Sequence, residues 1–385
     1  MDLSIIIVTY NVKYFLEQCL CSLNKAIEPL KAEIILIDNS SSDETIEFVQ
    51  CYFPGIKIVP NSENIGFAKA NNRAIAHASG RNILFLNPDT IISEDSLFNC
   101  VSFMDQLPLA GAIGIRMIDG RGQFLKESKR GFPTLWASFC KMSGLTRIFP
   151  SSSIFARYYM GHLPENQNQE ADSLSGAFMM VKKKVLDITG GFDEMFFMYA
   201  EDIDLSFRIK KAGFQNYYFS TSAILHFKGE STTKDTRYIK LFYKAMIQFV
   251  EKHYSPLQAF PIKILLNVII NIRSLFNRIT PTYTKSRLTN FEPENKFQSI
   301  GDNNSIGEIS HAVSLQQEAE NIIFCPGKQY SYKEMIEEMQ QPHANKRFYI
   351  HGYTTQSIIG SNSKEEQGVS WQITPIEHPS NNQLD

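Results

Sequence analysis

Short apolar runs alternate with helical patterns along the first ninety residues, and this alternation constrains the fold more than any other feature. The first run spans Ser4 to Val8, and the pattern returns with Glu33 to Ile37, Ile56 to Val59 and Asn82 to Leu86. Apolar strands that alternate with amphipathic helices are typical of a parallel sheet covered by helices. We therefore predict an α/β fold with a mostly parallel central sheet flanked by helices.

Polar side chains follow these apolar runs at the points where the strands should end. Thr9 and Tyr10 come after the first run, Asp38 ends the second, and Asn87 to Asp89 follow the fourth. Parallel sheets bind ligands beyond the carboxyl ends of their strands. We therefore expect these side chains to meet at one ligand-binding edge.

Composition narrows the classes of function. The 385 residues are 43% hydrophobic and 20% charged, as in a globular protein with one large domain and a smaller one. The formal net charge of -2 gives no general attraction for nucleic acid, so we expect no nucleic-acid partner. The six cysteines lack the paired spacing of a zinc site and are expected to be reduced thiols. Asp2 leads straight into an apolar run without a basic n-region, which predicts no signal peptide and a cytoplasmic location.

The C-terminal third is expected to differ in character from the rest. Tyr238 to Tyr254 has the pattern of one more helix. Leu257 to Ile279 follows, a helix whose polar residues form one narrow stripe while the rest of its circumference is apolar. A lipid surface and the underside of the catalytic domain are equally good partners for that helix, so peripheral membrane contact stays an open alternative. The polar stripe consists of Lys263, Asn267, Asn271, Ser274 and Arg278.

Changes in composition divide the chain into four expected parts. Residues 1–230 should form the catalytic domain, and 231–280 a helical extension. Residues 281–320 are rich in Asn, Ser, Glu and Gln, which suits a polar linker. Residues 321–385 should form a small C-terminal segment with a strand, a helix and a second strand over 321–325, 332–339 and 347–353.

Asn87, Pro88 and Asp89 are the most informative local group. A carboxylate placed directly after a buried strand can hold a divalent cation that bridges two phosphates, because such an ion prefers oxygen ligands. Asn, Pro and Asp are also the commonest turn residues, so a plain turn is the better interpretation of this group taken alone.

A second acidic group favours the metal interpretation. Glu201, Asp202 and Asp204 crowd three carboxylates beside aromatic residues, and such crowding is costly because like charges repel. Acidic residues also stabilise helix N-termini, so the same group could cap the helix that follows. His226 adds an imidazole that can ligate a metal ion, although a lone His is more often structural.

In this order and spacing, the motifs resemble the family 2 glycosyltransferases, inverting enzymes with a GT-A fold, over about residues 3 to 230. The Asn-Pro-Asp version is similar to the subgroup that includes bacterial rhamnosyltransferases of cell-surface polysaccharide assembly. The matching segments are Ser4 to Asn11, Ile37 to Asp43, Asn64 to Asn72, Leu86 to Thr90, Leu174 to Gly176 and Gly190 to Gly213.

The resemblance implies a function and a role for each matching residue. The protein should transfer a sugar from a nucleoside diphosphate to a hydroxyl of a saccharide acceptor, which in this subgroup is expected to be lipid-linked. Asp202 matches the general base, with Glu201 beside it. Asp89 and His226 would hold Mg²⁺ or Mn²⁺. The donor-binding residues would be Thr9, Tyr10, Asp38, Asn64, Gly66, Asn71 and Gly176.

Two departures from the family pattern matter for the donor. Asn87 replaces the first acidic residue of the usual metal motif, and Asn71 stands where many relatives have an arginine. A sugar nucleotidyltransferase is a weaker alternative, since the loop Thr9 to Lys13 lacks the glycine-rich phosphate-binding pattern. A non-catalytic sugar-binding or scaffold protein would suit the thinned metal motif, but Asp202 and His226 argue against it.

Overall fold

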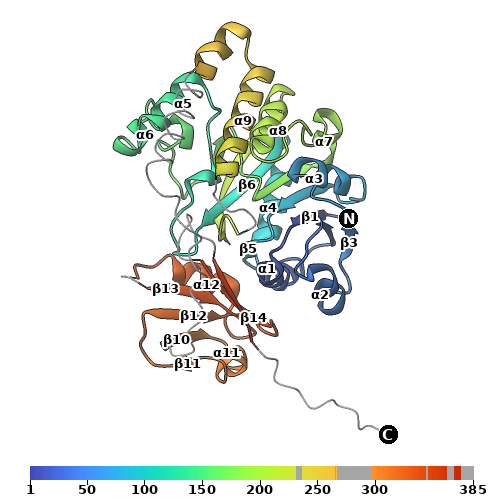
Figure 1. The fold of residues 1–385 in the computed structure, drawn as a ribbon, viewed down its shortest axis with the longest axis vertical. Helices are drawn as coiled ribbons and strands as arrows, with labels where there is room; N and C mark the ends of the chain where they lie inside the picture. Colours follow the sequence, from blue (N-terminus) through green and yellow to red (C-terminus); the bar gives the residue numbers. More distant parts are fainter. Residues whose placement is uncertain (231–235, 265, 267–295, 344–345, 362–367, 374–385) are drawn as a thin grey trace.

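The computed structural model describes residues 1–230, 236–264, 266, 296–343, 346–361 and 368–373. They form a large sheet covered by helices and a smaller sheet beside its lower end (Figure 1). Among these residues, no helix has both the length and the apolar character needed to cross a bilayer. The cysteines are all free thiols, as expected.

The first half of the large sheet has the predicted parallel order β3-β2-β1-β4. Every residue of β1 is buried, which explains why its sequence is an unbroken apolar run rather than an alternating one. Helices follow three of the strands and complete the expected strand-helix units. The elements are β1 (Leu3–Thr9), α1 (Lys13–Ala26), β2 (Ala32–Asp38), α2 (Thr45–Tyr52), β3 (Lys57–Pro60), α3 (Phe67–Ile75) and β4 (Asn82–Leu86).

The second half of the sheet is mixed, whereas the sequence pattern predicted a mostly parallel sheet. β8 runs antiparallel to β4 and β6, β6 and β9 are parallel, and both β5 and β7 pair antiparallel with β9. Only three residues join β4 to β5, too few for a parallel crossover, so β5 pairs elsewhere in the sheet. These strands are β5 (Thr90–Ile92), β6 (Ala110–Ile118), β7 (Gln169–Ala171), β8 (Phe178–Lys182) and β9 (Gln215–His226).

Helices cover both faces of the large sheet and bury two separate apolar layers. α1 and α4 pack on one face, and α3, α7 and α8 pack on the other. The α/β class expected for a GT-A fold is therefore confirmed. The further helices are α4 (Ser96–Gln106), α5 (Leu135–Met142), α6 (Leu145–Ile148), α7 (Lys183–Thr189), α8 (Glu201–Lys211) and α9 (Thr236–His253), with 3-10 turns η1 (Lys126–Ser128) and η2 (Arg157–Tyr159).

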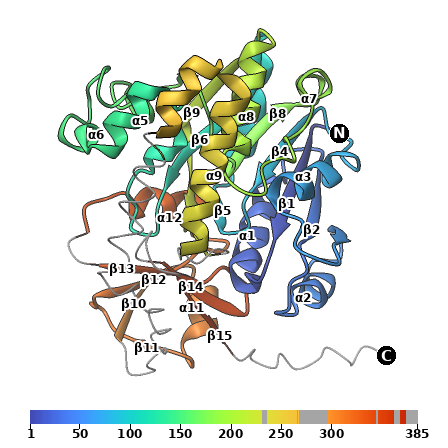
Figure 2. The ribbon, with the colours of Figure 1, turned by 45° about the horizontal axis from the view of Figure 1, so that its top comes forward.

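A helix over 256–264 follows α9 and folds back along it (Figure 2). Ile262 and Leu266 are buried in one cluster with Phe249 of α9, so this face packs within the protein. The opposite side chains, Leu257 and Phe260, are 89% and 67% exposed. The described part of this helix therefore meets the domain with one apolar stripe and leaves a second one uncovered. Asn267, Asn271, Ser274 and Arg278 of the expected polar stripe lie outside the described residues.

A second, six-stranded sheet occupies residues 296–372 in the order β11-β10-β12-β13-β14-β15. The expectation of a polar linker is wrong for 296–315, which form two strands and a helix, because their apolar positions are buried against the neighbouring strands. The strand, helix and strand expected from 321 onward are present. The elements are β10 (Lys296–Gly301), α11 (Asn303–Ile309), β11 (Ser314–Leu315), β12 (Asn321–Cys325), α12 (Tyr332–Met339), β13 (Arg347–Ile350), β14 (Ser357–Gly360) and β15 (Val369–Gln372).

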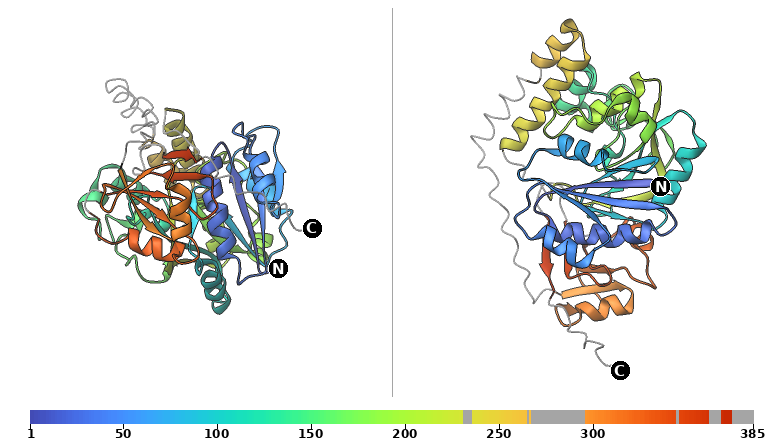
Figure 3. Two further views of the ribbon diagram at one scale, coloured as in Figure 1. Left: turned by 90° about the horizontal axis from the view of Figure 1, so that it is seen from below. Right: turned by 90° about the vertical axis from the view of Figure 1, so that its right-hand side faces the viewer.

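The smaller sheet docks on α1, β5 and β9 (Figure 3). Met335 and Ile336 of α12 share an apolar cluster with Ile91 and Leu225 of the large sheet. Both carboxylate oxygens of Glu94 accept hydrogen bonds from the first N–H groups of α12, at 2.8 and 3.0 Å. An apolar seam closed by a helix cap is a fixed interface rather than a loose tether.

Candidate active site

A cavity of about 250 Å³ lies at the carboxyl ends of β1 and β4. It brings together segments that are far apart in the sequence, including the ends of two strands, the start of α8 and the end of β9. Eight of the residues singled out from the sequence line it: Thr9, Tyr10, Asn64, Asp89, Gly176, Glu201, Asp202 and His226.

Three other expected donor-binding residues are not among the lining residues. Asp38 is buried just behind the cavity, next to Asn39, which does line it. Asn71 is also buried, but its amide donates to the carbonyl of Phe67 one turn back in α3. Gly66 has a φ of +85°, and a Cβ there would lie 2.6 Å from the carbonyl oxygen of Phe197. Gly66 therefore permits the close approach of two loops.

The pairing of β5 with β9 brings Asp89 and His226 close together. β5 and β9 are antiparallel with Thr90 opposite His226, so the residue before β5 meets the last residue of β9. Nε2 of His226 lies 3.4 Å from Oδ1 of Asp89 and 3.4 Å from the amide nitrogen of Asn87. Burial opposes ionisation of Asp89, but its interactions with His226 outweigh burial and lower the pKa of Asp89.

The residues fit a divalent ion held jointly with a ligand. Apart from its ion pair with His226, the buried Oδ1 of Asp89 has no hydrogen-bond partner, and an oxygen in that state can bind a cation. Within the described residues, no group of three or more His, Cys, Asp or Glu side chains could hold a metal alone. A metal ion bound by Asp89 and His226 alone would have positions open for phosphate oxygens, as substrate-bound Mg²⁺ sites usually do.

Backbone geometry aims the start of α8 at the cavity. Tyr199 and Ala200, just before Glu201, both have left-handed backbone angles, with φ of 71° and 66°. Each such residue costs on the order of 1 to 3 kcal/mol and persists only where the surroundings impose it. The strained turn places Glu201 and Asp202 on the cavity wall at the first turn of α8.

Asp202 is held by a buried arginine that the sequence motifs did not point to. Oδ2 of Asp202 accepts from Nη2 of Arg130 at 2.5 Å and from the backbone N–H of Gly176 at 3.0 Å. Burial opposes the charge of Arg130, but Asp202 outweighs that effect and raises the pKa of the guanidinium. Arg130 belongs to a segment without a local motif. Nothing in the sequence around it indicated that this basic residue would be buried beside Asp202.

Glu201 and Asp202 differ in their chemistry. Burial, followed by the nearby charge of Asp202, raises the pKa of Glu201 to about 8. Its buried Oε2 has no hydrogen-bond partner, whereas Oδ2 of Asp202 has two. Glu201 therefore keeps its proton to a higher pH than an ordinary glutamate, whereas Asp202 is hydrogen-bonded to the guanidinium of Arg130.

Asp204, the third carboxylate of the group, points away from the cavity. It accepts hydrogen bonds from Arg208 at 2.7 Å and from Lys252 and His253 of α9 at 2.6 Å each. These partners outweigh the effect of burial and lower the pKa of Asp204 to about 2. Asp204 thus fixes α8 against α9. The capping interpretation holds for Asp202, whose Oδ1 accepts from the backbone N–H of Ile203 in the first turn of α8 at 2.8 Å.

Lys228 is a second functional candidate without a role assigned from the sequence. It lines the cavity just after His226, and its Nζ lies 2.6 Å from Glu127. Burial opposes ionisation of Glu127, but Lys228 outweighs it and lowers the pKa of that carboxyl to about 2. The cavity therefore has one ammonium group beside its Asp89 and His226 pair.

Four buried oxygens around the cavity lack hydrogen-bond partners among the described residues. Buried polar atoms are nearly always paired, so a group of unpaired ones indicates a ligand that completes them. Two of the four belong to uncharged or protonated groups and two to carboxylates. The atoms are Oγ1 of Thr9, Oδ1 of Asp38, Oδ1 of Asp89 and Oε2 of Glu201.

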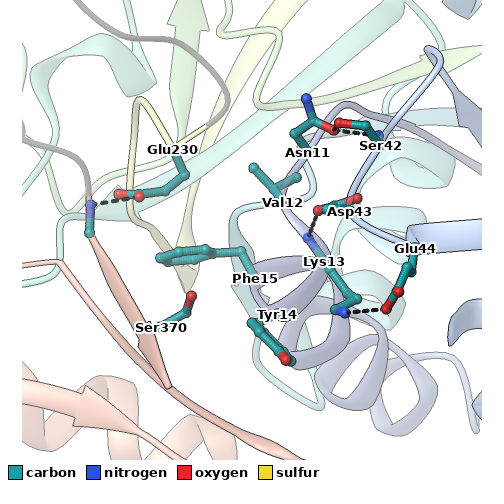
Figure 4. A pocket seen from close by; sticks show the side chains of 11 residues that line it. Asn11, Val12, Lys13, Tyr14, Phe15, Ser42, Asp43, Glu44, Glu230 and Ser370 are labelled. Atoms are coloured by element: carbon teal, nitrogen blue, oxygen red, sulfur yellow. Dashed lines mark hydrogen bonds and ion pairs between the residues drawn. The ribbon is translucent and has the colours of Figure 1, made fainter. Parts of the chain in front are cut away.

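A neighbouring cavity of about 550 Å³ lies between the start of α1 and β15 (Figure 4). The two cavities are lined by consecutive residues, because Tyr10 lines the first cavity and Asn11 lines this one. Oδ2 of Asp43 accepts from the backbone N–H of Lys13 at 3.0 Å and so caps α1 from a different loop. Glu230 accepts from the backbone N–H of Gly368 at 2.6 Å and ties the two sheets together on the other side.

Comparisons with known proteins show which family the N-terminal half resembles. Residues 4–188 match the model of Glycosyl transferase family 2. The N-acetylglucosaminyl-diphospho-decaprenol L-rhamnosyltransferase of Mycobacterium tuberculosis (strain CDC 1551 / Oshkosh) is 28% identical over 284 residues, which cover 71% of this chain and 91% of that protein. Rhamnosyltransferase WbbL of Escherichia coli (strain K12) is 29% identical over 58% of this chain and 82% of its own.

Solved structures with a similar arrangement include mannosyltransferase PcManGT from Pyrobaculum calidifontis in complex with GDP-Man and Mn²⁺. It has a TM-score of 0.47 and 20% identity and covers 70% of this chain and 69% of its own. The matched family model includes β1, β2, β4 and Asp89, and the two rhamnosyltransferases align with most of their own length. Residues 4–188 therefore form a domain of glycosyl transferase family 2.

Proposed function

We propose that this protein transfers a sugar from a nucleoside diphosphate to a hydroxyl of a lipid-linked saccharide, with inversion at the anomeric carbon and with a divalent metal ion. The reaction would serve cell-surface polysaccharide synthesis at the inner face of the cell membrane. The observation that carries this proposal is the group of buried oxygens without hydrogen-bond partners, of which those of Thr9, Asp89 and Glu201 belong to residues that line one cavity. The names of the rhamnosyltransferase relatives support the acceptor class.

The nucleoside would bind at the ends of β1 and β2. Oγ1 of Thr9 and Oδ1 of Asp38 are unpaired there, and the half-exposed ring of Tyr10 forms part of the cavity wall. A carboxylate oxygen accepts well from a base N–H, and a hydroxyl can accept from or donate to a ribose. Asp38 would thus be reached by a base edge even though it sits behind the cavity lining.

The diphosphate would bind between Asp89, His226 and Lys228. Asp89 and His226 would hold Mg²⁺ or Mn²⁺, which when bound offsets the negative charge that grows on the leaving diphosphate. The ammonium of Lys228 lines the same cavity and meets the same charge from the protein side. With Asn87 in place of a second carboxylate, we expect metal binding to depend on the diphosphate.

Asp202 would act as the general base in a single displacement. Its carboxylate takes the proton of the acceptor hydroxyl, the oxygen bonds to the anomeric carbon, and the bond from that carbon to the diphosphate breaks. Arg130 and the N–H of Gly176 fix the direction of the carboxylate, and protonated Glu201 can donate a hydrogen bond to the acceptor. Attack from the face opposite the leaving group inverts the anomeric carbon.

Thermal shift with UDP-, GDP- and dTDP-sugars, with and without Mn²⁺, tests the donor and metal assignments. We expect at least one nucleotide sugar to stabilise the parent protein, and more strongly with Mn²⁺. Asp89→Ala and His226→Ala should each weaken this Mn²⁺-dependent binding by about 10- to 100-fold or more, since loss of an outer partner alone has that effect.

His343→Ala provides the matched control, because His343 belongs to the smaller sheet's domain, where its ring bonds to the carbonyl of Glu338 and packs edge-on against Phe348. It should bind nucleotide and metal like the parent. If Asp89→Ala and His226→Ala also bind Mn²⁺ and nucleotide like the parent, Asp89 is only a turn residue and the metal assignment is wrong.

A further inference from the structure

Exposed apolar side chains gather at one end of the molecule. Of the seventeen large hydrophobic side chains that are exposed among the described residues, nine belong to residues 129–164 or to the helix over 256–264. Single exposed hydrophobics are ordinary, but a contiguous group marks a contact surface. Both segments lie at the end of the molecule away from the smaller sheet (Figures 1 and 2).

Residues 129–164, the α5–α6 lobe, hold a continuous aromatic cluster. Trp136 stacks on Phe139 with ring centroids 5.7 Å apart, and Phe155 lies 6.1 Å from Trp136 and 5.2 Å from Phe149. The indole N–H of Trp136 donates to the carbonyl of Ile154 at 3.1 Å, which fixes α5 to the loop after α6. The cluster is therefore an ordered surface. Its exposed members are Leu135, Trp136, Phe139, Ile148, Phe149 and Ile154, each 40% to 67% exposed.

The charge of the lobe is one-sided. Residues 129–164 contain five Lys or Arg and no Asp or Glu, in a chain whose net charge is -2. Lys129 and Arg130 point inward, but Arg147 and Arg157 are exposed and have no carboxylate partner in the described part of the chain. Exposed aromatic and aliphatic side chains beside unpaired arginines fit a surface with anionic headgroups above an apolar layer.

The lobe is also fixed to the catalytic helix. The backbone of Arg130 exchanges two hydrogen bonds with Ser173, and its guanidinium holds Asp202. Two residues later, Phe132 packs edge-on against Phe207 of α8 at 5.0 Å. A surface bound by the lobe would therefore keep a constant distance from the proposed base.

We propose that the α5–α6 lobe is a docking surface for an anionic lipid bilayer, with Trp136, Ile148 and Phe149 entering the acyl boundary and Arg147 and Arg157 meeting headgroups. The exposed Leu257, Phe260 and Ile264 extend the apolar surface at the same end of the molecule. Docking on a bilayer would bring the active site close to a lipid-linked acceptor, and in that respect this inference rests on the proposed function. Leu266 does not belong to this surface, because it is buried against α9.

Vesicle flotation with the full chain, without donor or acceptor, tests the proposal. The parent should float with vesicles of phosphatidylcholine and phosphatidylglycerol, much less with phosphatidylcholine alone, and less at high salt. Ile148→Ser should weaken binding by about 10- to 150-fold, as expected when a buried aliphatic side chain is lost. Arg147→Gln should weaken it about fivefold, as expected for one basic residue near an anionic surface.

Two matched variants control for general effects on the surface. Ile188 on α7 is 65% exposed, against 67% for Ile148, so Ile188→Ser removes the same side chain from another face. Lys211→Gln removes one exposed charge at the end of α8. Both controls should float like the parent. Equal binding by Ile148→Ser and Ile188→Ser would overturn the proposal, as would a parent that does not float with anionic vesicles.

Tryptophan emission gives an independent readout. The chain has two tryptophans, so Trp371→Phe leaves Trp136 as the sole reporter, and its emission should shift to shorter wavelength with anionic vesicles. An unshifted emission would overturn the proposal. A concentration-dependent dimer that Ile148→Ser abolishes, without any vesicle binding, would also overturn it and would indicate a protein contact. Nucleotide-sugar thermal shift on the same samples separates the two hypotheses, because lipid docking can fail while donor binding persists, and the reverse.

Discussion

Buried polar side-chain atoms differ in their hydrogen bonding between the two sheets. Around the large sheet's cavity, oxygens of Thr9, Asp89 and Glu201 are buried without partners. In the described part of the smaller sheet's domain, residues 296–343, 346–361 and 368–373, no buried side-chain oxygen or nitrogen is left in that state. Asp302, for example, accepts from four backbone N–H groups, two in the first turn of α11 and two in the loop after β12. A domain with completed hydrogen bonds is built for stability, whereas one with unpaired groups is built to receive a ligand.

Asp202 and Asp302 offer the sharpest test of this difference. Asp202→Asn should leave donor binding nearly intact while turnover falls by about two to four powers of ten, because a proton acceptor is lost. Asp302→Asn should instead lower the free energy of unfolding by about 1 to 3 kcal/mol, since one side-chain oxygen is replaced by a donor facing other donors. Single-turnover kinetics and denaturant titration measure the two effects. Normal turnover in Asp202→Asn would refute the base assignment.

The docking seam tests whether the smaller domain contributes only stability. Met335 is fully buried in the cluster that joins α12 to the large sheet. Met335→Ala should lower the free energy of unfolding by about 2 to 5 kcal/mol, through lost burial and the cavity left behind. Urea unfolding measures this loss, and nucleotide-sugar binding at low temperature should stay at the parental level. Loss of nucleotide binding in folded protein would mean that the smaller domain shapes the site.

The raised pKa of Glu201 makes the free energy of unfolding depend on pH. Its pKa is about 8 in the folded protein, above the ordinary value of 4.5, so folded Glu201 keeps a proton that the unfolded chain releases in between. The stabilising contribution is complete below pH 4.5 and is lost as the pH rises toward about 8, at about 1.4 kcal/mol per pKa unit. Glu201→Gln should flatten the decline of Tm over this range. A parallel decline in both proteins would contradict the proton assignment.

Backbone strain should matter for turnover in one domain alone. Ala200 precedes the catalytic pair and Thr354 lies in the smaller domain, and both have left-handed angles, with φ of 66° and 64°. Changing either residue to Gly should relieve roughly 1 kcal/mol of strain and raise Tm slightly. Turnover should fall a few-fold in Ala200→Gly and stay constant in Thr354→Gly. Equal turnover in the two variants would show that the strain before Glu201 does not serve catalysis.

Local pattern predicted most of the first half of the fold and many of the residues that line the cavity. The runs ending at Val8, Ile37 and Leu86 became strands because their residues, apart from the half-buried Glu33, are shielded from water, which the sequence pattern reports directly. The polar linker expected over 281–320 shows the limit of that reasoning. β10 reads as polar in composition, yet Phe297 is buried on its inner face, and one apolar side chain in a short strand is a weak signal.

The sequence by itself determined which residues stand at strand ends, and so placed Thr9, Asp38 and Asp89 at one edge of a sheet. Tertiary structure alone decided the pairs that give those residues their chemistry. Arg130 reaches Asp202 across 72 positions, and His226 meets Asp89 only because β5 pairs with β9. Periodicity records how each short segment is shielded from water, whereas the distance between two charges depends on strand register and loop path, which no local pattern contains.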